Sequence, residues 1–397
     1  MTALAITLTA VTSLVLLIWL SRHVLIWRER REGFLLTEDY PDNGQRPLVS
    51  VIVAAKDEAE NIGRCVNSML DQDYDNFEMI VVNDRSSDRT AAIVEGIAAR
   101  DDRLRLINIT DLPAGWCGKN NAMNTGIRQA KADWICMIDA DCTQTSRRSL
   151  RAAMQYALDQ EADMLSVLPN LEMKGFWESV VQPVCGGVMM IWFKPDRVND
   201  PDRREAYANG AFMLIRRDAY ERIGGHDAVR DQVNEDMHMA RRIKQHGRSL
   251  RVVRNRGLYL VRMYTSLRAI VRGWARIFYG TFGTLRRLTA TLAVLIVVSL
   301  LPYMSAAVGL AAWAAGAVPA NVSLACAAVG LIAVGTQWSV MYRFRRLIEA
   351  RPDLFWTYPL GCVVATACVV LALTKLRPGA QVTWRNTTYT RPVKEHQ

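Results

Sequence analysis

The stretch Trp134-Ile135-Cys136-Met137-Ile138-Asp139-Ala140-Asp141 decides the fold class. Five apolar residues run directly into two carboxylates spaced i, i+2. A short apolar run of this kind indicates a strand that is buried on both faces. An Asp-x-Asp pair also serves turns and helix caps, but carboxylate oxygens at a strand end are the ligands that hard divalent cations prefer. We therefore expect Asp139 and Asp141 to hold a metal ion at the end of a buried strand.

Strand-like and helical patterns alternate around this stretch. The expected strands are residues 48–55, 77–83, 104–109 and 134–138, and the expected helices are residues 58–70, 87–99 and 119–130. Alternation with short connections predicts a parallel, doubly wound sheet in an α/β domain. Ligands of such sheets bind at the carboxyl ends of the strands. Three polar clusters fall at such ends, Lys56-Asp57, Asp84-Arg85 and Asp139-Ala140-Asp141.

Both ends of the chain contain apolar runs. Residues 2–20 carry no charge and are followed, not preceded, by basic residues, which favours an uncleaved anchor with its N-terminus outside over a signal peptide. Residues 289–317, 322–341 and 355–374 are further candidate spans, the first with a kink expected at Pro302. Three spans would leave the basic tail outside, so a re-entrant hairpin is the alternative for the last segment. The basic residues of that tail are Lys375, Arg377, Arg385, Arg391 and Lys394.

The chain is basic, but its basic residues flank the apolar runs. Lys and Arg number 49 against 39 Asp and Glu, a net charge of +10. Groups such as Arg343, Arg345 and Arg346 at the end of a span usually fix topology and contact lipid headgroups. We therefore expect a membrane rather than a nucleic acid as the partner. The eight cysteines form no CxxC pair and no cluster with zinc spacing, which fits a reduced, cytosolic soluble domain.

Three further positions suggest chemistry at the strand ends. Lys119 stands at a helix start, where a cation opposes the helix dipole, so a phosphate or carboxylate partner would explain it. Asp84 closes a strand and is placed to accept a hydrogen bond from a base or ribose. Asp236, beside Glu235, opens a helix. The dipole alone favours acidic residues there, but a carboxylate that faces the ligand edge can also act as a general base.

Two stretches suggest contact with lipid. Residues 262–280 are basic and aromatic, as in an interfacial helix, and Arg272 within them either anchors to headgroups or binds a phosphate. Residues 176–193 are mostly apolar although they lie inside the soluble region. They form either a helix against the bilayer or a lipid acceptor, or a plain buried helix.

In this order the motifs resemble those of glycosyltransferase family 2, over about residues 45–285. The resemblance rests on residues 49–61, Asn83-Asp84-Arg85-Ser86, Gly118-Lys119, Asp139-Ala140-Asp141, Asn209-Gly210-Ala211-Phe212 and Glu235-Asp236. Other details are similar to bacterial membrane members grouped with hopanoid and carotenoid biosynthesis, namely Trp116-Cys117-Gly118-Lys119, Gly224-Gly225-His226, Glu235-Asp236-Met237 and Val382-Thr383-Trp384-Arg385. The chain departs from the Arg-Trp pattern of some relatives, because Gly273 separates Arg272 from Trp274.

The resemblance implies a GT-A fold, a nucleotide-diphosphate sugar donor such as a UDP-sugar, a Mg²⁺ or Mn²⁺ ion, and inversion at the anomeric carbon. It assigns site residues by position. Donor contacts would come from Asp57, Glu58, Asp84, Lys119, Asp139, Arg272 and Trp274, metal contacts from Asp139 and Asp141, and catalysis from Asp236 with Glu235 beside it.

The expected organisation is a membrane anchor, a catalytic domain and a membrane-bound C-terminal part. The expected ranges are a transmembrane helix (1–22), the GT-A domain (45–262), an interfacial amphipathic helix (263–287), a transmembrane region of about three segments (288–376) and a basic tail (377–397). The resemblance then implies a multi-pass enzyme of the inner cell membrane, with a cytoplasmic catalytic domain, that moves one sugar to a lipid acceptor. The alternatives are a polysaccharide synthase, which needs more spans, a polyprenyl-phosphate sugar synthase, and a non-catalytic membrane scaffold.

Overall fold

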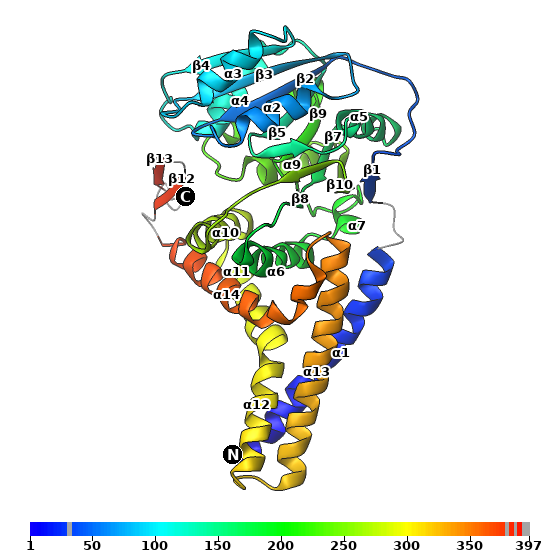
Figure 1. The fold of residues 1–397 in the computed structure, drawn as a ribbon, viewed down its shortest axis with the longest axis vertical. Helices are drawn as coiled ribbons and strands as arrows, with labels where there is room; N and C mark the ends of the chain where they lie inside the picture. Colours follow the sequence, from blue (N-terminus) through cyan, green and yellow to red (C-terminus); the bar gives the residue numbers. More distant parts are fainter. Residues whose placement is uncertain (30–33, 378–380, 385–386, 391–397) are drawn as a thin grey trace.

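Eight strands form one sheet in the order β1-β10-β7-β9-β5-β2-β3-β4, in the upper part of Figure 1. The computed structural model describes residues 1–29, 34–377, 381–384 and 387–390. The strands are β1 (Leu35–Thr37), β2 (Val49–Ala55), β3 (Phe77–Asp84), β4 (Leu104–Ile109), β5 (Trp134–Asp139), β7 (Met164–Leu168), β9 (Phe212–Arg216) and β10 (Leu250–Arg256). The four predicted strands pair parallel, as expected, whereas β9, for which no strand was predicted, runs antiparallel to both β5 and β7. A strand buried on both faces has the same apolar composition in either direction, so its sequence does not reveal its direction.

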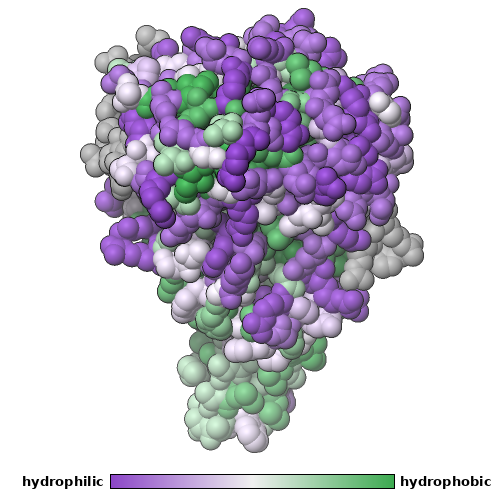
Figure 2. Space-filling model, turned by 45° about the horizontal axis from the view of Figure 1, so that its top comes forward, coloured by the Kyte–Doolittle hydropathy of each residue, from purple (hydrophilic) through white to green (hydrophobic). Residues whose placement is uncertain are grey.

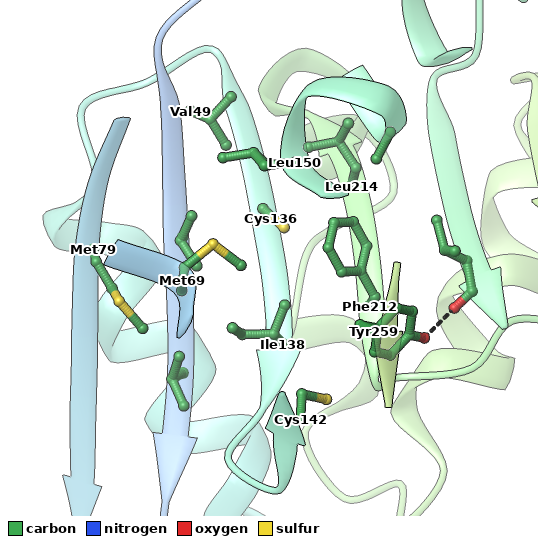
Figure 3. Packing of buried hydrophobic residues seen from close by; sticks show 14 of the residues in the cluster. Val49, Met69, Met79, Cys136, Ile138, Cys142, Leu150, Phe212, Leu214 and Tyr259 are labelled. Carbon is green, nitrogen blue, oxygen red and sulfur yellow. Dashed lines mark hydrogen bonds between the residues drawn. The ribbon is translucent and has the colours of Figure 1, made fainter. Parts of the chain in front are cut away.

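Helices cover both faces of this sheet. On one face lie α2 (Ile62–Leu70), α3 (Thr90–Ala98) and α5 (Ser149–Asp159), and on the other α4 (Gly118–Gln129), α8 (Arg217–Arg222) and α9 (Glu235–Gln245). Successive residues of a strand point to opposite faces, and accordingly Val51 and Val53 join the first apolar cluster while Ile52 joins the second. Figure 3 shows part of the first cluster, with Met69 of α2 near the central strands.

A second, three-stranded sheet extends the domain below β7 and β10. It contains β6 (Cys142–Gln144), β8 (Asn170–Leu171) and β11 (Tyr259–Val261) in the order β6-β11-β8. The Tyr259 hydroxyl donates a hydrogen bond to the carbonyl of Val167 in β7, as Figure 3 shows. This bond ties the two sheets together.

Two helices begin later than their sequence pattern predicts. Helix α2 begins at Ile62 rather than residue 58, and α3 begins at Thr90 rather than residue 87. The Glu58 N–H donates to Thr90 Oγ1 at 2.8 Å, and Ser87 donates to the Asp57 carboxylate through both its N–H and its hydroxyl. These contacts between two loops hold the intervening residues out of the helices.

Four helical segments are long and apolar enough to cross a membrane, Thr2–Ile26, Leu285–Ala314, Ala320–Leu347 and Pro352–Thr374. The first lies in α1 (Thr2–Glu29), the second comprises α11 (Leu285–Ala293), a π-helical stretch η2 (Val294–Leu300) and α12 (Leu301–Ala314), and the third is α13 (Ala320–Leu347). The π-helical turns lie directly before Pro302, where a disruption is expected because proline cannot donate the helical hydrogen bond. Figure 2 shows that the narrow end of the molecule, formed by these helices, is hydrophobic.

Helices α1, α12 and α13 pack closely along one another. The Thr12 and Ser305 hydroxyls form a hydrogen bond at 2.7 Å between α1 and α12. A Cβ on Gly309 would collide with the backbone of Ala327, and a Cβ on Gly330 would collide with that of Ala306. Small residues of this kind allow membrane helices to approach closely.

The fourth candidate segment lies differently from the other three. It consists of a short 3-10 helix, η3 (Pro352–Thr357), and α14 (Tyr358–Thr374), a continuous helix rather than the suggested re-entrant hairpin. In Figure 1, α14 lies at the base of the sheet domain beside α6 (Phe176–Trp192) and α10 (Leu267–Phe282), with which it shares one apolar cluster. A Cβ on Gly361 would collide with the Val180 carbonyl, so α14 lies directly against α6.

Arg345, expected at a lipid headgroup, is instead fully buried. Its guanidinium donates to the Ser179 carbonyl of α6 at 2.9 Å and to Thr357 Oγ1 at 3.3 Å. The expectation of lipid contact is therefore wrong for this residue, because it joins α13 to α6 and η3.

The C-terminal tail is described only in part. Strands β12 (Gln381–Trp384) and β13 (Thr387–Thr390) pair antiparallel. The predicted basic residues Arg385, Arg391 and Lys394 lie outside the described residues.

Candidate active site

A cleft of about 600 Å³ lies at the carboxyl ends of β2 and β5. Seven predicted site residues line it. The seven residues are Glu58, Lys119, Asp139, Asp141, Glu235, Asp236 and Arg272. The chain thus brings most of the predicted site residues, separated by more than 200 positions, to one place.

Lys119 lies at the centre of the acidic residues. Its Nζ is 2.6 Å from Asp139 Oδ1 and 2.8 Å from Glu235 Oε1. Burial disfavours the charged amine, but the two carboxylates outweigh it and hold the Lys119 pKa well above its usual value. The partner expected for a cation at this helix start is therefore a pair of carboxylates from β5 and α9, which Lys119 links.

Asp236 is held by backbone donors on both carboxylate oxygens. The Gly210 N–H donates to Oδ2 at 2.9 Å, and the Met237 N–H donates to Oδ1 at 2.7 Å. Burial in the cleft, and then the charge of Glu235, raise the pKa of Asp236 to about 7. A carboxylate with this pKa is suited to accept a proton near neutral pH.

Asp139 and Asp141 stand at the end of β5, as the sequence predicts, and both line the cleft. The described residues contain no cluster of three or more His, Cys, Asp or Glu side chains that could hold a metal by itself. Magnesium sites in nucleotide-binding enzymes often use only one or two carboxylates, with phosphate oxygens of the substrate as the other ligands. The residues present fit an ion held in that way.

Three predicted donor residues do not line this cleft. The Asp84 carboxylate accepts two hydrogen bonds from Arg85 and lies so close to Gly118 that a Cβ there would collide with it. Asp57, with a left-handed φ of 52°, accepts hydrogen bonds from Ser87. Both lie at the ends of neighbouring strands, next to the cleft, where they organise the loops.

Trp274 is the third such residue. It lies in the apolar cluster of α6, α10 and α14 and lines a neighbouring apolar pocket instead. Arg272 and Trp274 therefore point to different cavities, and Gly273 between them is covered by the Tyr264 ring, which a Cβ at that position would overlap.

Four residues of the site make contacts that their sequence motifs do not predict, namely Arg276, Tyr264, Asn120 and Asn234. Arg276, one helical turn after Arg272, lines the cleft and donates to the Tyr264 hydroxyl at 3.1 Å. Asn120 donates to three carbonyls of residues 229–232 and so fixes the loop before α9. Asn234 donates to Thr281 Oγ1 at 2.9 Å. Only the i, i+4 spacing of the two arginines gave a sequence signal.

Comparison with known proteins identifies the domain that carries this cleft. Residues 50–224 match the model of glycosyl transferase family 2. These residues are a family 2 domain. The cleft is completed by Glu235, Asp236 and Arg272 from the segment that follows.

Relatives of the family 2 domain include two 4,4'-diaponeurosporenoate glycosyltransferases, from Staphylococcus aureus strains MRSA252 and USA300. Both are 24% identical, over 63% and 61% of this chain and 66% and 64% of their own lengths. The matches thus span just under two thirds of these relatives.

A solved structure of the mannosyltransferase PcManGT from Pyrobaculum calidifontis, in complex with GDP-Man and Mn²⁺, has a TM-score of 0.54 at 19% identity. The match covers 92% of this chain and 99% of that one. The similarity shows that the chain has the GT-A fold.

Proposed function

We propose that the protein is a membrane-bound, inverting glycosyltransferase that moves one sugar from a nucleotide-diphosphate sugar, with a UDP-sugar expected, to a lipid acceptor. The observation that carries the proposal is the cleft, which Asp139, Asp141 and Asp236 line together. This cleft lies beside the apolar cluster of α6, α10 and α14. The family 2 domain and the relatives named for a carotenoid acceptor support it.

In the proposed reaction Asp236 is the general base. Its carboxylate accepts the proton of the acceptor hydroxyl while that oxygen attacks the anomeric carbon. The bond from this carbon to the diphosphate oxygen breaks, and its electron pair leaves with the nucleotide diphosphate. A single displacement inverts the configuration. The Gly210 and Met237 N–H groups orient the Asp236 carboxylate for this step.

Asp139 and Asp141 would hold Mg²⁺ or Mn²⁺, which when bound neutralises charge on the diphosphate. Lys119 positions Asp139 and Glu235 through its two ion pairs. Arg272 and Arg276, one turn apart on α10, line the same cleft and supply positive charge that can bind a diphosphate.

We further propose that three segments cross the inner membrane and that the catalytic domain lies in the cytoplasm. With α1, α11–α12 and α13 as the spans, an outside N-terminus leaves the family 2 domain and the end of α13 inside. Helix α14 then lies at the cytoplasmic surface against α6 and α10, and the basic tail is inside, in agreement with the positive-inside rule. With three spans in all instead of four, the basic tail no longer lies outside, so its charge no longer conflicts with the positive-inside rule. All eight cysteines are free and buried, which fits this compartment.

The test uses the full chain in lipid nanodiscs with a panel of nucleotide sugars, Mg²⁺ or Mn²⁺, and a total lipid extract as acceptor. We expect release of a nucleotide diphosphate together with a glycosylated lipid. The Asp236→Asn variant should lose transfer by at least about 100-fold, the usual contribution of a general base, but should still bind the donor. Near-normal turnover in this variant would exclude Asp236 as the base, and absence of donor binding in the wild type would contradict the proposed function.

A further inference from the structure

The cleft adjoins a second, apolar cavity of about 200 Å³. Its walls come from α6, α10, the last turn of α13 and the segment after β7, which lie near one another at the base of the sheet domain in Figure 1. Apolar side chains predominate in the lining, among them Leu168, Met189, Met190, Phe193, Ile277 and Leu347. Unbranched methionines suit a surface that adapts to flexible apolar ligands.

This cavity shares part of its wall with the catalytic cleft. Tyr207, Asn209 and Met263 line both. Asn209 directly precedes Gly210, whose N–H holds the Asp236 carboxylate. A chain that occupies the cavity would therefore bring its polar end to the proposed base.

The cavity wall contains unsatisfied polar groups and open space, unlike a finished hydrophobic core. Gln182 is 1% exposed and Trp274 is 5% exposed. Within the described part of the chain, neither Gln182 Oε1 nor Trp274 Nε1 has a hydrogen-bond partner. Buried polar atoms are normally paired, and exceptions often mark sites that another molecule completes. At Gly186 a Cβ would meet nothing within 4 Å.

The position of the cavity indicates where its occupant comes from. Phe344 and Leu347 belong to the last turn of α13, a helix long and apolar enough to cross a membrane. Phe176 and Ile191 of α6 are 50% and 39% exposed. With α13 as a span, as proposed above, the cavity lies at the inner end of that helix, where an apolar chain can enter it from the bilayer.

We propose that this cavity, which we call the acceptor pocket, binds the apolar chain of a membrane lipid whose hydroxyl reaches Asp236. The inference rests on the proposed function and assigns the acceptor class to a defined place. An engineered protein cavity of about 150 Å³ binds benzene, so the acceptor pocket holds a segment of a lipid chain and leaves the remainder in the bilayer.

The test compares two Gly→Leu variants in nanodiscs. Gly186→Leu places a side chain into open space in the acceptor pocket, whereas Gly335→Leu does so on α13, away from the pocket, and serves as the control. Both changes replace a helical glycine, so neither reduces helix propensity. The probe is hexadecanol, both as acceptor and, with a diazirine in its chain, as a photo-crosslinking reagent.

Each buried methylene is worth about fourfold in affinity, so a leucine that displaces about three of them should raise the KM for hexadecanol roughly 60-fold. The KM for the nucleotide sugar should keep its value. Crosslinks to residues 182–193 should be present in the wild type and in Gly335→Leu and absent in Gly186→Leu.

Equal crosslinking and equal KM for hexadecanol in all three proteins would overturn the acceptor pocket while leaving the transferase proposal intact. A different result is also informative. If Gly186→Leu loses the crosslinks but the wild type does not turn over the donor, the acceptor pocket is supported and the proposed function is contradicted.

Discussion

The protonation state of Asp236 should control activity across neutral pH. Because burial and Glu235 raise its pKa to about 7, the active carboxylate form is lost as the pH falls through 7. A group with that pKa is about 91% deprotonated at pH 8 and about 9% at pH 6, so kcat/KM for the acceptor should fall roughly tenfold. An aspartate with an ordinary pKa would give no change over this range. Burial lowers the pKa of His238, which moves it away from the midpoint expected at pH 7.

The Glu235→Gln variant tests the cause of the shift. Asp236 Oδ2 and Glu235 Oε1 each lie 3.5 Å from the point where a Cβ on Gly210 would sit, so they are no more than twice that distance apart. At this largest possible separation, and with an effective dielectric constant of about 20, two negative charges repel by about 2.4 kcal/mol. This repulsion corresponds to a change of about 1.7 in the pKa of Asp236. Loss of the Glu235 charge should therefore move the midpoint of the pH profile down to between about 5 and 6.

The assay is the initial rate of sugar transfer at low acceptor concentration from pH 5 to 9, in the wild type, in Glu235→Gln and in Glu95→Gln. Glu95 is exposed on α3 and serves as the matched control. The midpoint, rather than the maximal rate, is the readout, because Glu235 also pairs with Lys119. A profile that is flat between pH 6 and 8, or a midpoint that Glu235→Gln leaves in place, would refute the reasoning.

Three further predictions follow from the site and the membrane region. Asp141→Ala should weaken metal-dependent donor binding by at least about tenfold; a metal titration that matches the wild type, measured by calorimetry, would exclude Asp141 as a ligand. Gly280→Ala should lower kcat by about tenfold or more, because the Asn234 side chain occupies the space of the new Cβ, while Gly96→Ala, in open space on α3, should retain full activity. A C-terminal fluorescent reporter should lie on the same side of the membrane as the family 2 domain; labelling from the opposite side would show that α14 crosses the bilayer.

The sequence predicted the local pattern of the fold better than its three-dimensional connections. The alternation of strands and helices up to residue 139 is confirmed, because each buried strand is a continuous apolar run. The direction of β9 could not be read, and β1 has only three residues, too few for a pattern. The late starts of α2 and α3 depend on bonds between two loops about 30 positions apart, which no local propensity encodes.

The same difference between local sequence pattern and three-dimensional contacts holds for the site. Lys119 and the strand-end aspartates could be predicted because each has a local anomaly, a cation at a helix start or carboxylates after an apolar run. Asn120 and Tyr264 carry no such signal. Asn120 acts on a loop more than 100 positions away, and Tyr264 acts through its packing on α10, so both contributions become visible only when these elements are packed together.

Helix α10 explains why the chain departs from the Arg-Trp pattern of some relatives. Gly273 accommodates the Tyr264 ring, and Gly280 accommodates the Asn234 side chain. Tyr264 lines the cleft, and Asn234 directly precedes Glu235 and Asp236. The two glycines lie seven residues apart, about two helical turns, and therefore on the same side of α10. Gly273, which interrupts the pattern, is thus a steric requirement of the Tyr264 ring, and Gly280 lets the same helix approach the loop that carries the proposed base. Since α10 also packs against α14, this helix connects the loop that carries Asp236 to the apolar cluster of α6, α10 and α14.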